Sequence, residues 1–526
     1  MKRFNILTII FTGLLLVSSL QCNKMLDESP VSTADPKTFW KDQNDAKSWM
    51  AGIYNQLQNV LRTNWFDWGE VRSDNMTVAG TGNAQTKLLN NALTANDSDI
   101  NGITRWTDLY TGISLCNFGI RYFPEMITEN RDQGQALYKD YLGQCYALRA
   151  LLYFYGLRVW GKMPMLLEPV EDLSQEVQYP RSDIAVVKKQ IQDDIEASLG
   201  LIGNDLTSRG IKYRIQKAGV YALQTDVHMW FQEYDQALAA SQHCITTSKC
   251  TWVSTPMQWK DMFVNPEAST ETIFNLYWND VERGNTGVGV CQKLGSGSNT
   301  HQYKVRPELW QELKNHAENN VTTDGRFYLC WDTITYNLQS EYAANVVQFG
   351  KFAVWEALPG GDFIFEGNNQ CNAKIPIYRF ADVMLLRAEA LTHKGRFPEA
   401  LEILNKVRER VGYMDKAEEA DVPPGEDKTK YIERLILKER QFELIGEGKR
   451  WFDLCRIDKM YDFTNTGYAY LREMMNPLLA AREGATQFDN NAATPNAMGR
   501  ILYPINSDAF NANRKLVGDQ NPPYDE

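Results

Sequence analysis

The 526-residue chain has few of the residues that build metal and redox sites. It contains five histidines and nine cysteines, and no HxH, HExxH or CxxC grouping occurs. These groupings place paired imidazoles or thiolates within reach of one metal ion or one disulfide, so their absence excludes the common zinc and thioredoxin-like motifs. We expect no cofactor, and we expect most cysteines to be buried free thiols.

The chain also lacks an excess of positive charge. Its 55 Lys and Arg residues face 66 Asp and Glu residues, which gives a net charge of −11 and a pI of about 5.2. A surface that binds a phosphate backbone needs clustered cations, so nucleic acid is excluded as a partner.

The sequence also contains no GxSxG or Walker motif. A hydrolase would therefore have to use carboxylates hidden among the many acids.

Long apolar runs are confined to the N-terminus. Lys2 and Arg3 precede an apolar stretch at 4–17, and Cys22 follows shortly after it. This plan predicts a lipoprotein-type signal peptide at 1–21, with Cys22 acylated and holding the mature chain to a membrane. Gln21 departs from the small residue usual before such a cysteine, and a plain signal peptide cut nearby is the alternative. No later run reaches 18 apolar residues, so no transmembrane helix is expected.

Apolar residues at three- and four-residue steps predict a mainly α fold. The pattern indicates helices at 42–61, 137–160, 183–200, 214–232, 235–248, 306–315, 379–394, 398–411 and 430–446. The helices around Ala237 and Ala400 each follow an aromatic and a short turn, at the spacing of tetratricopeptide helix pairs. We expect one domain at 22–526, with a helical framework mainly at 42–61, 106–248 and 379–526. A loop-rich ligand lobe with short strands is expected mainly at 62–105 and 250–378.

The chain is rich in aromatic residues, with 14 Trp, 25 Tyr and 22 Phe. Those in the loop-rich segments have no helical face to join. Sugar binding in water needs flat apolar rings beside planar polar groups. The predicted ligand-binding residues are Trp65, Trp68, Arg72, Asp74, Asn75, Trp278, Asn279 and Tyr303. The competing interpretation is that any one of these aromatic side chains belongs to the core.

Two charged clusters admit a functional and a structural interpretation. Glu439 and Glu443 could form a carboxylate pair for glycoside hydrolysis, but the alternating charges from Glu439 to Asp453 favour an ion-pair network between the last helices. Asp97 and Asp99 with the following Asn and Gly resemble the first half of a calcium loop, whose second half departs from the pattern. A solvated turn that caps the next helix explains the same residues. The sequence therefore leaves open whether this turn binds calcium.

Several sequence segments, in this order, resemble the SusD/RagB family of outer-membrane nutrient-binding lipoproteins of Bacteroidetes. They are CNKMLD at 22–27, YLGQCYALRA at 141–150, WGKMP at 160–164, RFADVMLLRAEA at 379–390, ERQFEL at 439–444, EGKRWFDL at 447–454, LYPI at 502–505 and QNP at 520–522. The resemblance implies a SusD-like framework that docks on a TonB-dependent, SusC-like porin and a lobe that captures glycan. It also implies no catalysis and a lipid anchor on the outer face of the outer membrane.

The resemblance leaves more than one function open. The first hypothesis is a surface glycan receptor that hands oligosaccharide to the porin. The same scaffold could bind peptides for import, which would rely on backbone-pairing edges and charged pockets. A secreted lipoprotein glycoside hydrolase and a pure helical-repeat adaptor are weaker alternatives.

Overall fold

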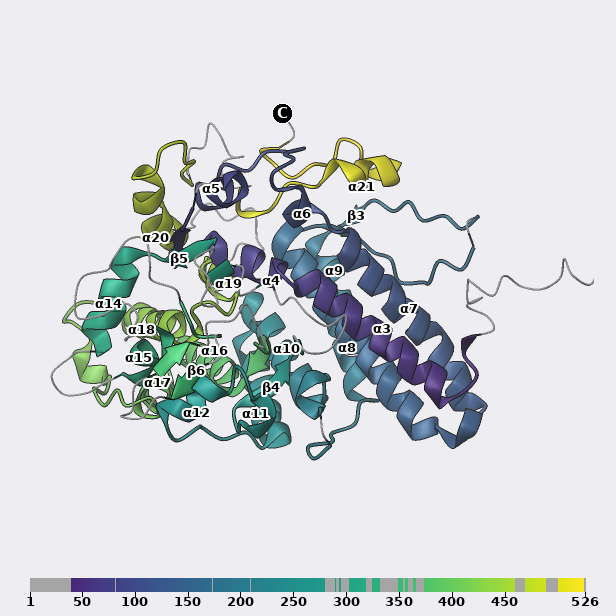
Figure 1. The fold of residues 1–526 in the computed structure, drawn as a ribbon, viewed down its shortest axis with the longest axis horizontal. Helices are drawn as coiled ribbons and strands as arrows, with labels where there is room; N and C mark the ends of the chain where they lie inside the picture. The colour runs from purple at the N-terminus through teal and green to yellow at the C-terminus, as the bar shows by residue number, and fades with distance from the viewer. Residues whose placement is uncertain are drawn as a thin grey trace, which may run out of the picture.

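The computed structural model of the chain is mainly helical (Figure 1). It describes residues 39–80, 82–172, 174–208, 210–279, 289, 293–294, 302–317, 324–331, 349–352, 355–357, 363–365, 373–458, 469–488 and 500–524. The predicted signal peptide and Cys22 lie outside these residues. Within them, no helix is both long and apolar enough to cross a membrane.

Four long helices form the N-terminal part of the framework: α3 (Gln43–Leu61), α7 (Thr107–Thr128), α8 (Gln135–Trp160) and α9 (Ile184–Leu199). They lie side by side in Figure 1, and α8 packs against both α7 and α9. Asp42 accepts hydrogen bonds from the first backbone amides of α3, which fixes where that helix begins. Because α8 is covered by its neighbours, nearly its whole C-terminal two thirds is buried.

Two helix hairpins follow, and they form one stack. The first is α10 (Lys217–Trp230) with α11 (Tyr234–Ser248), and the second is α16 (Phe380–His393) with α17 (Phe397–Glu409). Ala237 of α11 and Ala390 of α16 share a core cluster, because small residues let the two helices approach closely. The predicted tetratricopeptide-like pairs are therefore confirmed, and the residues inserted between them leave the pairs in direct contact.

The remaining helices are shorter, apart from α18. They are α4 (Asn64–Phe66), the π-helix η1 (Asp67–Val71), α5 (Asn83–Leu89), α6 (Asn101–Thr104), α12 (Pro256–Asp261), α14 (Pro307–Ala317), α15 (Gly325–Cys330), α18 (Lys428–Leu444), α19 (Arg450–Ile457), α20 (Ala469–Ala480) and α21 (Ser507–Ala512), with 3-10 turns η2 (Arg131–Gln133), η3 (Ile211–Tyr213), η4 (Pro266–Ala268), η5 (Glu419–Asp421) and η7 (Arg514–Leu516). Several of the short ones fall in the predicted loop-rich segments.

The strands of the described residues are short and pair two by two, always antiparallel. They are β1 (Met76–Val78) with β5 (Tyr303–Val305), β2 (Met163–Pro164) with β3 (Arg181–Ser182), β4 (Thr272–Asn275) with β8 (Pro376–Arg379), and β6 (Trp355–Ala357) with β7 (Phe363–Phe365). In the first pair Val78 faces Tyr303, and in the third Thr272 faces Arg379. The β1–β5 pair joins the two loop-rich segments to each other, and the β4–β8 pair holds the second of them beside the start of α16.

One large hydrophobic core connects both parts of the framework with strands β1, β2, β4, β5 and β8. Cys116, Cys145, Cys244, Cys250, Cys330 and Cys455 are buried and free, as the sequence predicted for most cysteines. Cys291 and Cys371 lie outside the described residues.

Candidate functional site

The two tryptophans of the first predicted ligand segment belong to the core. Trp65 and Trp68 expose only 2% and 1% of their surface. The Trp68 indole Nε1 donates to the carbonyl of Ile103 at 2.9 Å, and its ring lies edge-on to Trp160 at 5.3 Å. The prediction that these rings present an exposed face to sugar is wrong, because α4 and η1 fold them inward.

A close approach of two backbone segments explains this burial. Gly69 of η1 lies so near Gly448 that a Cβ on Gly69 would fall 1.9 Å from the Gly448 carbonyl oxygen. Gly448 has a φ of +68°, a left-handed conformation that glycine adopts without strain. Beside this contact, Glu70 accepts hydrogen bonds from the backbone amides of Gly446 and Gly448. Burial raises the pKa of Glu70 to about 7, although these hydrogen bonds act to lower it.

Arg72, Asp74 and Asn75 are also buried, and they bind protein groups. Arg72 donates to the carbonyl of Ile501 at 2.9 Å and lies over the Trp451 ring. Asp74 pairs with Arg450 at 2.7 Å, and the amide of Asn75 donates to Glu70. Burial alone would raise the pKa of Asp74, but the Arg450 charge outweighs it and the pKa is lowered. The prediction that these three residues are accessible to ligand is therefore wrong.

The second predicted ligand segment has one accessible side chain. Trp278 exposes 3% of its surface and Tyr303 exposes 1%, so both are core residues. Tyr303 sits on β5 with its ring 5.7 Å from Phe66. Asn279 is half-buried, and its amide donates to the Tyr277 hydroxyl at 3.1 Å. The prediction that Trp278 and Tyr303 expose their rings to sugar is therefore wrong. A ligand contact at Asn279 stays a prediction.

The cluster from Glu439 to Asp453 is an ion-pair network, as the structural interpretation predicted. Glu443 accepts from Arg379 and Arg410 at 2.6 Å each and from Arg326 at 2.8 Å. Burial would raise the pKa of Glu443, but the three guanidinium charges hold it well below its usual range. Glu439 is bound by Arg326 at 2.7 Å. Neither carboxylate is available for acid–base chemistry, because each is ionised and paired.

Asp97 and Asp99 hold a cation of the chain itself. The Lys87 ammonium lies 2.8 Å from Asp97 and 2.7 Å from Asp99. Helix α6 begins at Asn101 with no side-chain cap, so the predicted capping role of this turn is wrong. Lys87 occupies the space between the two carboxylates, where a calcium ion would have to bind.

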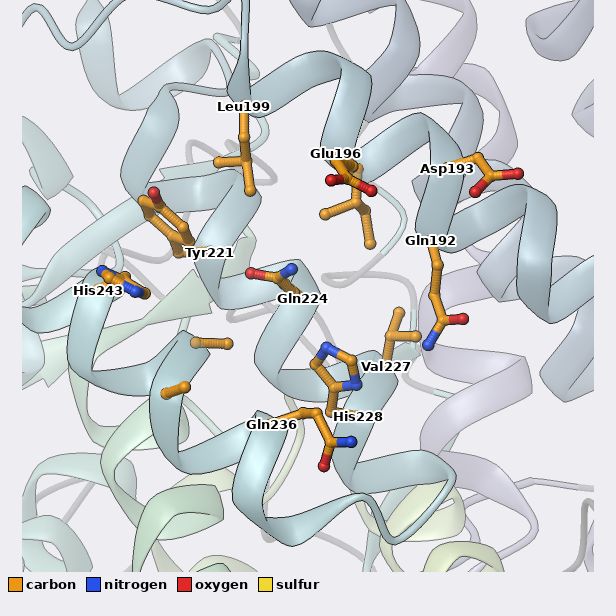
Figure 2. Close-up of a pocket in the computed structure, with 13 residues that line it drawn as sticks. Gln192, Asp193, Glu196, Leu199, Tyr221, Gln224, Val227, His228, Gln236 and His243 are labelled. Atoms are coloured by element: carbon orange, nitrogen blue, oxygen red, sulfur yellow. The ribbon is translucent and has the colours of Figure 1, made fainter.

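One hollow of the described surface lies between α9, α10 and α11, with a volume of about 580 Å³. Figure 2 shows the amides of Gln192, Gln224 and Gln236 around it. Tyr221 and His243 close one side with stacked rings 5.1 Å apart. This groove has a mixed polar and apolar lining and is built on three helices. The sequence did not single it out, because each helix contributes ordinary surface residues.

A smaller hollow of about 360 Å³ lies between the start of α7, the 164–179 segment and α21 with η7. Trp106, Tyr110 and Tyr179 line it. The helical spacing of Trp106 and Tyr110 predicts that both belong to the framework. This local pattern does not indicate that the start of α7 lies beside the C-terminal segment.

Comparison with known proteins identifies the family. A SusD family model matches residues 244–524, and a model described as "Starch-binding associating with outer membrane" matches residues 24–228. The first covers more than half of the chain. The chain belongs to the SusD family. SusD-like protein P38 of Formosa agariphila is 29% identical to it over 548 aligned residues, which include all of both chains.

Solved structures of the SusD superfamily share this fold. A Bacteroides thetaiotaomicron SusD superfamily protein aligns with 92% of this chain and 99% of its own, at a TM-score of 0.70 and 20% identity. A laminarin-binding SusD-like protein aligns with 92% of this chain and all of its own, at a TM-score of 0.68 and 19% identity. The helix hairpins and the short paired strands of this SusD-family chain are therefore the architecture of the superfamily.

Proposed function

We propose that this SusD-family protein is a non-catalytic glycan receptor, lipid-anchored through Cys22 and facing outward from the outer membrane. The observation that carries the proposal is the match of both halves of the chain to SusD-type family models, one of them described as starch-binding. The structural neighbour that binds laminarin supports a glycan as the ligand class. The pairing of Glu439 and Glu443 with arginines supports a binding role over a hydrolytic one.

Binding of a glycan is tested by affinity electrophoresis and calorimetry of residues 22–526 against a panel that includes starch and laminarin. We expect retention by at least one polysaccharide and no release of reducing ends. Binding of peptides without binding of any glycan in the panel would contradict the proposal and favour peptide import on the same scaffold.

Asn279 is the one predicted ligand residue that we retain as a contact. Its side chain is half-buried, and Asn279 is the last residue described before a gap in a loop-rich segment. We expect Asn279→Ala to weaken binding of the retained glycan about threefold to tenfold, the size of one lost hydrogen bond. Unchanged affinity by calorimetry would remove Asn279 from the site.

The captured glycan is delivered to a SusC-like TonB-dependent porin in this proposal, and the helical framework makes the contact. The groove between α9, α10 and α11 supports docking there, because it is open and presents both polar and apolar side chains from three helices. Co-purification with a SusC-like porin of the same organism tests the contact. We expect Gln236→Lys, in the groove, to reduce the yield of complex. Gln242→Lys, on α11 but outside the groove, should leave the yield unchanged.

A further inference from the structure

The hollow between α7 and α21 brings together three segments that are far apart in the sequence. The start of α7, the segment that leads to β3 and the C-terminal α21 with η7 all line it. In Figure 1 the α21 segment lies beside α6 and β3 at one edge of the molecule. Its volume of about 360 Å³ is within the range of pockets that hold small ligands.

The aromatic rings of this hollow are fixed in place. Trp106 packs edge-on against Tyr110 with ring centres 5.5 Å apart. The Tyr110 hydroxyl donates to the Pro164 carbonyl at 2.7 Å, and the Tyr179 hydroxyl donates to the Glu176 carbonyl at 3.0 Å. Rings held in this way lose little conformational freedom when a ligand stacks on them.

Exposed apolar side chains gather around the same hollow. Five large hydrophobic residues are exposed in the part of the chain that the structure describes. Two of them, Val177 at 45% and Tyr179 at 36% exposure, line the hollow. A third, Val517 at 66%, directly follows the lining residue Leu516. A concentration of exposed apolar surface at a hollow marks a binding site.

Neutral polar groups stand beside the apolar surface. Thr107, Thr111 and Ser114 lie along one face of α7, and all three line the hollow. Asn513 lines it from the C-terminal segment, and its amide donates to the Tyr179 carbonyl at 2.7 Å. The carboxylate of Asp508 is neutralised by Arg105 at 2.8 Å. Hydroxyl and amide groups next to aromatic faces, without a free charge, are the complement of an uncharged sugar.

We infer that this hollow is an oligosaccharide subsite, in which Tyr179 contacts the C–H face of an uncharged sugar ring, while Trp106, which exposes 8% of its surface, forms part of the floor. The hydroxyls of Thr107, Thr111 and Ser114 bind sugar hydroxyls. The inference rests on the proposed glycan-binding function and adds a location to it. None of the sequence-predicted ligand residues lines this hollow.

The test compares variants of residues 22–526 for binding to the polysaccharide that the unmodified protein retains in the panel. Tyr179→Ala removes a ring that is largely outside the core, and Ala512→Trp places a bulky ring on an exposed lining position. We expect Tyr179→Ala to weaken binding about fivefold to tenfold, the cost of losing one aromatic contact. We expect Ala512→Trp to weaken it as well, because the new ring fills the space that the sugar would occupy. Val186→Ala is the matched control, because Val186 is 53% exposed on α9 and does not line the hollow.

The possible outcomes separate the two proposals. Retention of a glycan that neither Tyr179→Ala nor Ala512→Trp weakens would overturn the subsite but not the proposed glycan-receptor function. Retention of no glycan by the unmodified protein would overturn both. Binding of apolar peptides or lipid vesicles that Tyr179→Ala abolishes, with glycan affinity unchanged, would assign the hollow to another partner and overturn the subsite. Circular dichroism of each variant confirms that it is folded.

Discussion

Trp68 and Tyr179 show how the same class of side chain takes two roles in this protein. Trp68 is enclosed by other rings and donates its indole hydrogen to Ile103. Tyr179 donates its hydroxyl to the backbone but leaves more than a third of its surface in contact with solvent. Burial, which depends on what the rest of the chain packs over a residue, decides between core and binding surface.

Substitution of Trp68 is therefore expected to affect folding before it affects binding. Trp68→Ala leaves a large cavity and removes a buried hydrogen bond, and we expect the free energy of unfolding to fall by about 3–5 kcal/mol. Urea unfolding followed by fluorescence measures this change. Val186→Ala, on the exposed surface of α9, should change stability by less than about 0.5 kcal/mol. Equal stability of the Trp68 variant and the unmodified protein would contradict the core assignment.

Glu70 gives the protein a pH-dependent stability term. Its pKa is raised by burial from 4.5 to about 7, so the folded state binds a proton more tightly than the unfolded state. The stabilisation by the protonated Glu70 carboxyl group is fully present below pH 4.5. It is lost as pH rises through about 7, because the buried carboxyl group then ionises. Gln cannot ionise, so we expect Glu70→Gln to lose less stability than the unmodified protein when the pH rises from 5 to 7.5. Urea unfolding at pH 5 and pH 7.5 compares the two proteins, and an unchanged difference between these pH values would rule out Glu70 as the source.

At the scale of elements, the π-helix η1 is held against the turn before α19. The contact depends on two glycines, because neither Gly69 nor Gly448 has room for a side chain. This docking pulls Trp65 and Trp68 into the core, and it explains why a segment without helical periodicity is buried. The EGKRWFDL segment is accordingly a structural junction of this SusD-family fold.

We expect Gly69→Ala to destabilise the protein strongly. The new Cβ would lie 1.9 Å from the Gly448 carbonyl oxygen, so η1 or the turn must move. Gly52→Ala in α3 is the control, since nothing lies within 4 Å of its added Cβ. Alanine is the better helix former, so this control should raise stability by about 0.5–1 kcal/mol. Thermal unfolding of both variants tests the contrast, and similar melting temperatures would show that the close contact carries no cost.

At the scale of the whole molecule, a buried charge network joins distant parts of the chain. Arg326 lies on α15, Arg379 ends β8, and Arg410 follows α17, yet all three donate to Glu443 of α18. The network connects the inserted loop-rich segment with the helix hairpins. It fixes the position of each relative to the other, because a buried charge must stay with its partners.

Removal of the central carboxylate should be costly. Glu443→Gln leaves three buried guanidinium groups without their shared anion, and we expect a loss of about 3–5 kcal/mol in unfolding free energy. Glu409→Gln, which breaks an exposed pair with Lys406, should leave stability unchanged. Chemical unfolding of both proteins measures the difference. A mild effect at Glu443 would show that the arginines find other acceptors.

The same network predicts sensitivity to acid. The pKa of Glu443 is held well below its ordinary 4.5, and the pKa of Asp324 is lowered to about 2 by Arg326 and His316, which outweigh burial. These carboxylates stabilise the fold above pH 4.5, and the stabilisation is lost as pH falls through their folded-state pKa values. We expect the urea midpoint to drop steeply between pH 4 and about pH 2. A flat midpoint over this range would contradict the pairing.

The amino-acid sequence alone determined the helical framework, the hairpin pairs and the charge network. Helix periodicity depends on neighbours three and four residues away, and mixed charges within one segment indicate pairing. The ordered segments from 22 to 522 also indicate the SusD family.

The tertiary structure alone decided which aromatic residues are accessible. Trp65 and Tyr303 lack helical periodicity but are buried, because chain segments hundreds of residues away pack against them. Tyr110 has that periodicity but is only half-buried and lines a hollow, because the start of α7 lies beside the C-terminal α21 there. Local spacing carries no information about such distant contacts, so the candidate sugar surface could be located only from the folded chain.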